Sequence, residues 1–172
     1  DLFKCTNCDL IQIGKSIPLK FMYGLTYGYY TSLSKLMVRH IIAKYYRIKR
    51  FIKLKNNDHV LDIGCNDGTF LNFLLKKNKK LNCLGIDPTS KKYKHMINKK
   101  IKVIFDYFSL KNIKKHINKK FKLICAFAMF YDVETPNRFC KEINKLLTND
   151  GIFILELSYL PLLIKNMTYD QI

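Results

Sequence analysis

No stretch of this sequence approaches the roughly 20 consecutive apolar residues that a transmembrane helix requires. The longest apolar stretch, residues 151–164, is interrupted by Glu156, Ser158 and Pro161. No secretory signal peptide is visible, although the chain begins with Asp1 rather than Met. We therefore expect a protein without a membrane partner, and we expect this chain to be part of a longer protein, cut at both ends.

The sequence also lacks the regularly spaced cysteines of a disulfide framework. One Cys-x-x-Cys pair, Cys5 and Cys8, is present, and the other cysteines are scattered through apolar segments at positions 65, 83, 125 and 140. Scattered thiols are typical of a reducing compartment, so we expect a cytoplasmic protein. We interpret the four single cysteines as small buried apolar residues.

Acidic residues and arginine are scarce. The formal net charge is +18, because 31 Lys and Arg face 13 Asp and Glu. Such a charge is common in nucleic-acid-binding proteins. However, most of these residues are lysines spread over every expected helix among Asn and Ile, whereas arginine is the better bidentate ligand of phosphate. We interpret the charge as a solvated lysine coat and do not expect a nucleic-acid partner. A non-catalytic nucleic-acid-binding module remains the alternative from a different class.

Hydrophobic periodicity predicts an α/β domain after a first helix. That helix, residues 34–50, carries a stripe with three- and four-residue spacing that includes His40, Ile41 and Lys44. Short apolar segments then alternate with helical patterns. Strands are expected at 59–63, 82–86, 102–105, 123–127 and 152–157, and helices at 69–77, 90–99 and 136–147. This order predicts a Rossmann-like, doubly wound parallel sheet with helices on both faces.

A glycine- and acid-containing loop follows the first strand of this domain. Ligands of open α/β sheets bind beyond the carboxyl ends of the strands, and glycine lets the backbone approach them closely. A dinucleotide fingerprint would place glycines at 64, 66 and 69, but Asn and Thr occupy the last two positions. Two acids in this segment favour a ligand with a cationic part, such as an ammonium or a sulfonium. The candidate binding residues are Asp62, Gly64, Asn66, Asp67 and Gly68.

Two further acidic motifs follow the second and third strands. Asp87, followed by Pro88, lies 23 residues after Gly64, where a carboxylate can accept the hydroxyls of a ribose. After the third strand, Asp106 can accept a hydrogen bond from an adenine amine, and Phe108 can stack on the base. Together with the glycine loop, these motifs resemble the class I S-adenosylmethionine (SAM)-dependent methyltransferases over residues 58–160. This resemblance implies SAM as the cofactor and adds Phe127 to its binding site.

The flanking segments make the resemblance more specific. In order, they resemble the sugar C-methyltransferases, which methylate C3 of nucleotide-linked 4-keto deoxysugars. The segments concerned are 3–12, 27–32 with Met37, Arg39 and His40, 127–136, 155–160, and 169–172. The resemblance implies that Cys5 and Cys8 are half of a four-cysteine structural zinc site of the full-length protein, and that Tyr29 is a catalytic tyrosine on the substrate side. It also places a catalytic base in a His-Glu-His run after Ile172.

The resemblance suggests four parts. They are a zinc-module remnant with a Tyr-rich segment (1–30), a linking helix (31–57), the SAM-binding domain (58–160) and the start of a C-terminal region (161–172). Class I methyltransferases finish their sheet with antiparallel strands, which we expect to be missing here, leaving the strand at 152–157 as an apolar edge. The alternative function within this class is a methyltransferase for another small molecule or for RNA.

Overall fold

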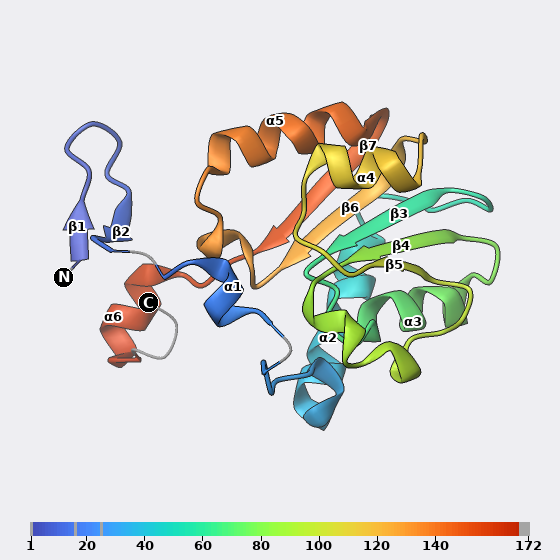
Figure 1. The fold of residues 1–172 in the computed structure, drawn as a ribbon, viewed down its shortest axis with the longest axis horizontal. Coiled ribbons are helices and arrows are strands. Elements are labelled where there is room, and N and C mark those ends of the chain that lie inside the picture. The colour runs from blue at the N-terminus through green and yellow to red at the C-terminus, as the bar shows by residue number, and fades with distance from the viewer. Residues whose placement is uncertain (1, 16, 25, 169–172) are drawn as a thin grey trace.

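A parallel five-stranded sheet forms the centre of the computed structural model, which describes residues 2–15, 17–24 and 26–168. The strand order is β5-β4-β3-β6-β7, and all four pairings are parallel (Figure 1). The strands are β3 (His59–Ile63), β4 (Asn82–Ile86), β5 (Lys102–Ile104), β6 (Phe121–Phe127) and β7 (Leu147–Glu156). The expected α/β fold with a doubly wound parallel sheet is therefore confirmed.

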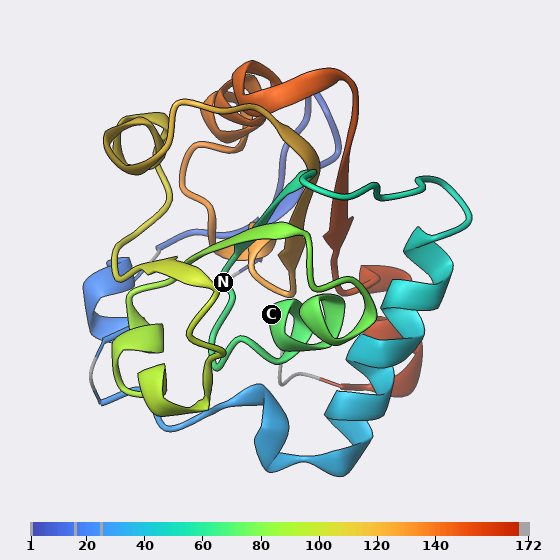
Figure 2. The same cartoon turned by 90° about the vertical axis from the view of Figure 1, so that its right-hand side faces the viewer.

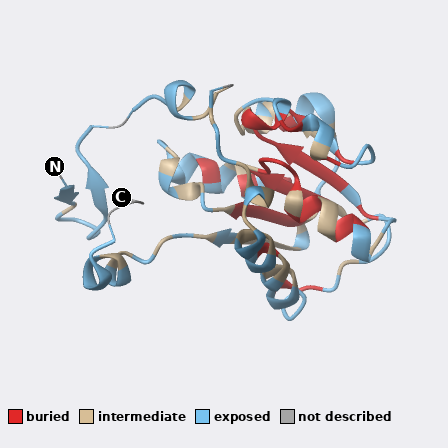
Figure 3. Cartoon of the chain, turned by 90° about the horizontal axis from the view of Figure 1, so that it is seen from below, coloured by how far each residue is buried: buried red, intermediate tan, exposed pale blue. Residues whose placement is uncertain are grey.

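Helices cover both faces of the sheet, as the end-on view shows (Figure 2). On one face lie α2 (Lys35–Ile48) and α3 (Thr69–Lys77), and on the other α4 (Leu110–His116) and α5 (Pro136–Leu146). Successive side chains of a strand point to opposite faces. Val60 therefore packs with α2 and α3, whereas Leu61 packs with α4 and α5. Buried residues concentrate in this layered unit (Figure 3).

Local sequence signals start the helices as expected. The Oγ atom of Ser34 accepts a hydrogen bond from Met37 N at 3.4 Å and caps α2, and Pro136 begins α5. Gly68 precedes α3 with φ of +73°, a conformation that costs glycine little. The helix α4, which the periodicity did not reveal, is capped by Ser109, whose Oγ accepts from Asn112 N at 3.1 Å.

The helix expected at residues 90–99 is wrong. Two 3₁₀ turns stand there instead, η2 (Thr89–Lys91) and η3 (Lys94–Met96). Tertiary hydrogen bonds take the groups that a regular helix would use. Asn72 Nδ2 donates to Met96 O and Asn72 Oδ1 accepts from Asn98 N, both at 2.9 Å, and the fully buried Ser90 Oγ anchors the segment by donating to Asn66 O. Long-range contacts therefore override the local helical pattern here.

The last strand, β7, begins five residues earlier than the expected residue 152. Leu147 pairs with Phe121, and the register then shifts before Leu123 pairs with Ile152. Among the described residues, β7 pairs only with β6 and forms an edge of the sheet, as expected. Its side chains are half-buried or exposed.

Two segments lie outside the layered unit. The hairpin β1 (Leu2–Lys4) and β2 (Ile11–Ile13) and the terminal helix α6 (Leu160–Asn166) lie to one side of it and are largely exposed (Figures 1 and 3). Between the hairpin and α2 run α1 (Leu19–Met22) and η1 (Thr31–Leu33). No helix in the described part of the chain is long and apolar enough to span a membrane.

Candidate functional site

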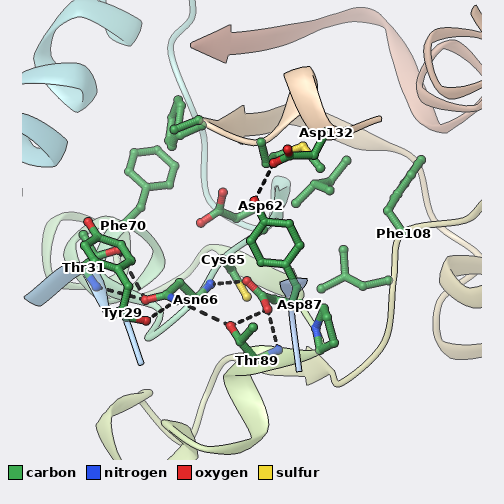
Figure 4. Close-up of a pocket in the computed structure, with 18 of the residues that line it drawn as sticks. Tyr29, Thr31, Asp62, Cys65, Asn66, Phe70, Asp87, Thr89, Phe108 and Asp132 are labelled. Carbon is green, nitrogen blue, oxygen red and sulfur yellow. Dashed lines mark hydrogen bonds between the residues drawn. The ribbon is translucent and has the colours of Figure 1, made fainter. Parts of the chain in front are cut away.

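A pocket of about 220 Å³ opens at the carboxyl ends of the parallel strands (Figure 4). Its lining combines the loops after β3, β4, β5 and β6 with the segment that precedes α2 and with residues of α2 itself. Most of the residues singled out in the sequence line it, namely Tyr29, Asp62, Gly64, Asn66, Asp87, Pro88, Asp106, Phe108 and Phe127. Asp67 and Gly68 are absent from the lining, as are Cys5 and Cys8. Five segments far apart in the sequence thus meet at one cavity.

The loop after β3 approaches the pocket with its backbone. Gly64 has φ of +73°, and a Cβ there would come within 3.2 Å of Met129 Cγ. Asn66 also has a left-handed backbone, with φ of +47°. A side chain at position 64 would therefore be strained and would fill the space beside the loop.

Asp87, at the end of β4, makes three hydrogen bonds within the protein. Its Oδ2 accepts from Asn66 N at 2.9 Å, and its Oδ1 accepts from both the N and the Oγ1 of Thr89 at 2.6 Å (Figure 4). Only 7% of Asp87 is exposed. An ionised carboxylate offers about four lone-pair sites, so this arrangement leaves Asp87 room for one further donor rather than for two.

Two titratable side chains of the pocket, the buried Asp62 and the half-buried Lys44, have shifted pKa values. Burial, together with the nearby Asp87 carboxylate, raises the pKa of Asp62 to about 8, and Lys44 partly opposes this shift. Burial also lowers the pKa of Lys44 to about 8. The Lys44 Nζ lies 4.4 Å from the centroid of Phe127 and forms an ion pair with Glu156, which His40 contacts at 2.6 Å.

Lys44 is a pocket residue that the sequence analysis did not assign. The sequence did contain an indication of its role, because Lys44 falls on the apolar stripe of the first helix, where a charged side chain is unusual. The structure shows why the stripe tolerates it: its ammonium meets an aromatic ring and a carboxylate at the pocket.

The buried Asp62 predicts a pH-dependent stability. Because the folded state raises its pKa, the protonated carboxyl stabilises the fold below about pH 4, and this contribution is lost as the pH rises towards 8. Asp62→Asn keeps the shape without the charge. We expect this variant to be more stable than the wild type by about 1–3 kcal/mol at pH 8 and to show little difference at pH 4. Thermal unfolding at both pH values measures this, and an equal difference at both would contradict it.

Asn66 and Asp67 hold the segment before α2 against the loop. Asn66 Oδ1 accepts from Thr31 N at 2.9 Å, and Asn66 Nδ2 donates to the backbone oxygen of Tyr29 at 3.2 Å. Asp67 Oδ2 accepts from Ser32 N at 2.7 Å. Asp67 is 1% exposed and faces protein groups on both oxygens, which gives it a structural role that the sequence did not indicate.

Asp106 and Phe108 approach the pocket differently from each other. Asp106 is exposed, and its carboxylate accepts from Tyr107 N at 2.7 Å and from Asn112 Nδ2 at 2.8 Å. Phe108 packs on Phe139 with ring centroids 4.8 Å apart and adjoins the core on the α4 and α5 face. Both residues line the pocket, but Phe108 also serves the core.

Tyrosines form the far wall of the pocket. Tyr23, Tyr27 and Tyr29 follow one another with ring centroids 5.2 and 6.3 Å apart, in edge-to-face contact. Tyr23 Oη donates to Asp132 Oδ2 at 2.6 Å. Tyr23 and Asp132 were not assigned from the sequence, because a bond between residues 109 positions apart leaves no local pattern.

The cysteines fall into two groups. Cys5 and Cys8 lie in the connection between β1 and β2, away from the pocket. The described residues contain no group of three or more His, Cys, Asp or Glu placed to hold a metal, whereas structural zinc takes four ligands. Cys65, Cys83 and Cys125 are buried as expected, but Cys140 is exposed, because it lies on the outer face of α5. The motif at 169–172 lies outside the described residues.

The sheet order, the loop after β3 and the pocket at the strand ends define a nucleotide-type α/β domain of the class I methyltransferase kind. A protein family described as a methyltransferase domain matches residues 37–170, and the chain belongs to this family. A search of curated proteins gave no match.

Solved structures of methyltransferases share the fold. The plantazolicin methyltransferase BpumL, in complex with a pentazolic desmethylPZN analog and SAH, is 21% identical with a TM-score of 0.58, and the match covers 76% of this chain and 49% of that one. BamL, bound to a triazolic analog and SAH, is 18% identical with a TM-score of 0.58, over 78% of this chain and 51% of that one. Precorrin-6y C5,15-methyltransferase from Geobacter metallireducens is 10% identical with a TM-score of 0.55, over 78% and 68%. The chain thus spans about half the length of the plantazolicin enzymes.

Proposed function

We propose that this domain binds SAM in the pocket and transfers its methyl group to C3 of a nucleotide-linked 4-keto deoxysugar. The observation that carries the cofactor assignment is the charge of the pocket. In a chain of net charge +18, the pocket lining contains four aspartates and one lysine. The four aspartates are Asp62, Asp87, Asp106 and Asp132. A cavity of this sign favours a ligand that carries an ammonium and a sulfonium over an anionic dinucleotide.

The side chains of the pocket match the separate parts of SAM, namely its ribose, its adenine and its methionyl group. The remaining lone pair of Asp87 would accept one ribose hydroxyl, and Asp106 with Phe108 would face the adenine. Asp62 has no ion-pair partner within the described residues, which suits its carboxylate to the ammonium of the methionyl group, whereas Lys44 would share its ammonium between Glu156 and the methionyl carboxylate. The SAH in the plantazolicin methyltransferase structures supports the same cofactor.

The methyl group is made electrophilic by the sulfonium of bound SAM. The contribution of this chain is orientation and exclusion of water. Asp62 and Lys44 would fix the methionyl end, and Asn66 holds the backbone of Tyr29 against the cofactor loop. Since methyl transfer needs the attacking carbon in line with the sulfonium, such positioning supplies much of the rate.

The sugar acceptor rests on the resemblance of the flanking segments and on the tyrosine wall. The ring faces of Tyr27 and Tyr29 offer apolar surface for the carbon face of a sugar, and their hydroxyls offer hydrogen bonds. Tyr29 is 40% exposed, so a substrate can reach its side chain. The acidic lining disfavours an RNA backbone, which supports a small-molecule acceptor over RNA and over a non-catalytic nucleic-acid module. Zinc at Cys5 and Cys8 remains a proposal for the full-length protein.

Calorimetry with S-adenosylhomocysteine tests the cofactor site. We expect Asp87→Ala to weaken binding more than tenfold, because a nearly buried charged acceptor is lost. Asp87→Asn keeps the size of the side chain. It therefore distinguishes the effect of losing the charge from the effect of disturbing the loop that Asp87 holds through Asn66 N. Asp150→Asn is the matched control, since Asp150 pairs with Lys122 at an exposed turn. Unchanged affinity in both Asp87 variants would contradict the assignment.

Methyl transfer tests the acceptor. The full-length gene product is incubated with SAM and a nucleotide-linked 4-keto deoxysugar, and the product is analysed by mass spectrometry. We expect a mass increase of one methyl group, located at C3 by the loss of the C3 proton that this group replaces. If the protein binds S-adenosylhomocysteine but leaves the sugar unmodified, the cofactor assignment stands and the sugar assignment falls.

A further inference from the structure

One end of the pocket lies across the cavity from Asp87 and Thr89 (Figure 4). The segment containing α1 and the turn η4 (Phe130–Asp132) build this end. Their side chains that line the pocket are almost all aromatic, and Asp132 brings the one charged group among them. These residues include Leu19, Tyr23, Tyr27, Tyr131 and Asp132, and Tyr29 connects them to Asn66, which donates to its backbone oxygen.

Asp132 is held in place by Tyr23. The hydrogen bond from Tyr23 Oη to Asp132 Oδ2 is 2.6 Å long, which is typical of a hydroxyl that donates to a carboxylate. Tyr23 is itself fixed, because its backbone oxygen accepts a hydrogen bond from Tyr107 Oη at 2.8 Å. Figure 4 shows Asp132 across the cavity from Asp87 and Thr89. The carboxylate of Asp132 therefore has a defined position at the end of the pocket formed by the α1 segment and η4.

The hydrogen-bonding capacity of Asp132 is not used up within the described part of the chain. The side chain receives one hydrogen bond there, from Tyr23, whereas an ionised carboxylate accepts about four. Burial raises the pKa of Asp132, and the Tyr23 bond opposes this shift. A half-buried carboxylate with free lone pairs costs free energy unless a partner supplies donors. Because Asp132 lines the pocket, its remaining lone pairs are within reach of a bound molecule.

We propose that Asp132 selects the acceptor by accepting a hydrogen bond from a hydroxyl of an uncharged sugar ring packed against the tyrosines. This inference rests on the proposed function, because it assigns a residue to its acceptor. A carboxylate at this place admits hydroxyl donors and repels phosphate, so the ring enters the pocket and the diphosphate stays outside it. The Tyr23–Asp132 pair thus sets which end of a nucleotide-linked sugar meets the cofactor.

Binding of a nucleotide-linked 4-keto-6-deoxyhexose to the full-length protein saturated with S-adenosylhomocysteine tests the proposal. We expect Asp132→Asn to lower sugar affinity about tenfold or more, because a hydrogen bond to a charged group is lost. Tyr23→Phe should lower it about threefold to tenfold, since the carboxylate stays but is less fixed. The controls are Asp150→Asn and Tyr46→Phe, both at exposed sites away from the pocket.

Two further measurements identify the cause of any loss. Affinity for S-adenosylhomocysteine should stay within about twofold in Asp132→Asn, because Asn keeps the size of the side chain and can still accept from Tyr23. The nucleoside diphosphate alone should bind this variant as well as it binds the wild type, since the diphosphate stays outside the pocket.

Each outcome decides between the two claims. If the wild type binds S-adenosylhomocysteine but not the sugar, the sugar part of the proposed function is wrong. If the wild type binds the sugar and Asp132→Asn binds it equally well, the inference about Asp132 alone is overturned. If Asp132→Asn loses S-adenosylhomocysteine together with the sugar, Asp132 has a structural role and the inference is also overturned.

Discussion

Phe121→Ala is expected to lower the free energy of unfolding by about 3–5 kcal/mol, the range for removing a large buried aromatic side chain. Phe121 is fully buried in the cluster between the sheet and α4 and α5. It also marks the register shift between β6 and β7, where it pairs with Leu147. Loss of the ring therefore leaves a cavity at the point where the edge strand joins the sheet. Denaturant unfolding of wild type and variant measures the difference.

The matched control is Phe51→Ala. Phe51 is 75% exposed, so its removal should change the free energy of unfolding by no more than about 0.5 kcal/mol. Similar losses in the two variants would mean that the packing around Phe121 does not determine stability.

Asp67→Ala is expected to lower the free energy of unfolding by about 2–4 kcal/mol. The carboxylate accepts from Ser32 N on one oxygen and from Thr69 N and Oγ1 on the other. Removal leaves two partly buried backbone donors and the Thr69 hydroxyl without their acceptor, and an unmade hydrogen bond of a buried group costs about 1–3 kcal/mol. Because one of them lies in the segment before α2, we also expect faster hydrogen exchange at the amide of Ser32.

Asp58→Ala is the control for this variant. Asp58 also accepts a backbone N–H, from Lys55 at 2.6 Å, but in an exposed turn where water replaces the lost acceptor. We expect a loss below about 1 kcal/mol and unchanged exchange at Ser32. If Asp67→Ala destabilises the protein without changing the exchange at Ser32, Asp67 supports the cofactor loop but does not hold the segment before α2.

Phe121→Ala tests the core of the domain, whereas Asp67→Ala tests how the segment before α2, which carries Tyr29, is attached to it. Phe121 supports the sheet itself, whereas Asp67 and Asn66 join the Tyr29 segment to the loop after β3. Since the same loop donates to Asp87 through Asn66 N, the proposed cofactor and acceptor ends share one hydrogen-bonded network.

The sequence by itself determined which strand each motif follows and at which edge of the sheet the pocket lies. The short apolar strands, the glycine loop after β3 and the acid after β4 are local patterns. Since parallel strands bring their carboxyl ends to one edge, local patterns were enough to gather Asp62, Gly64 and Asp87 at one site.

Only the tertiary structure decided which groups share this site and what each contacts. It joined Tyr23 to Asp132, turned Asp67 towards Ser32, and placed Lys44 beside Phe127. It also replaced the helix expected at 90–99 with two short turns. The physical reason is common to all of these. A repeating apolar pattern records which face of an element is buried, whereas a single hydrogen bond or ion pair between distant residues has no period, so it becomes visible only when the chain is folded.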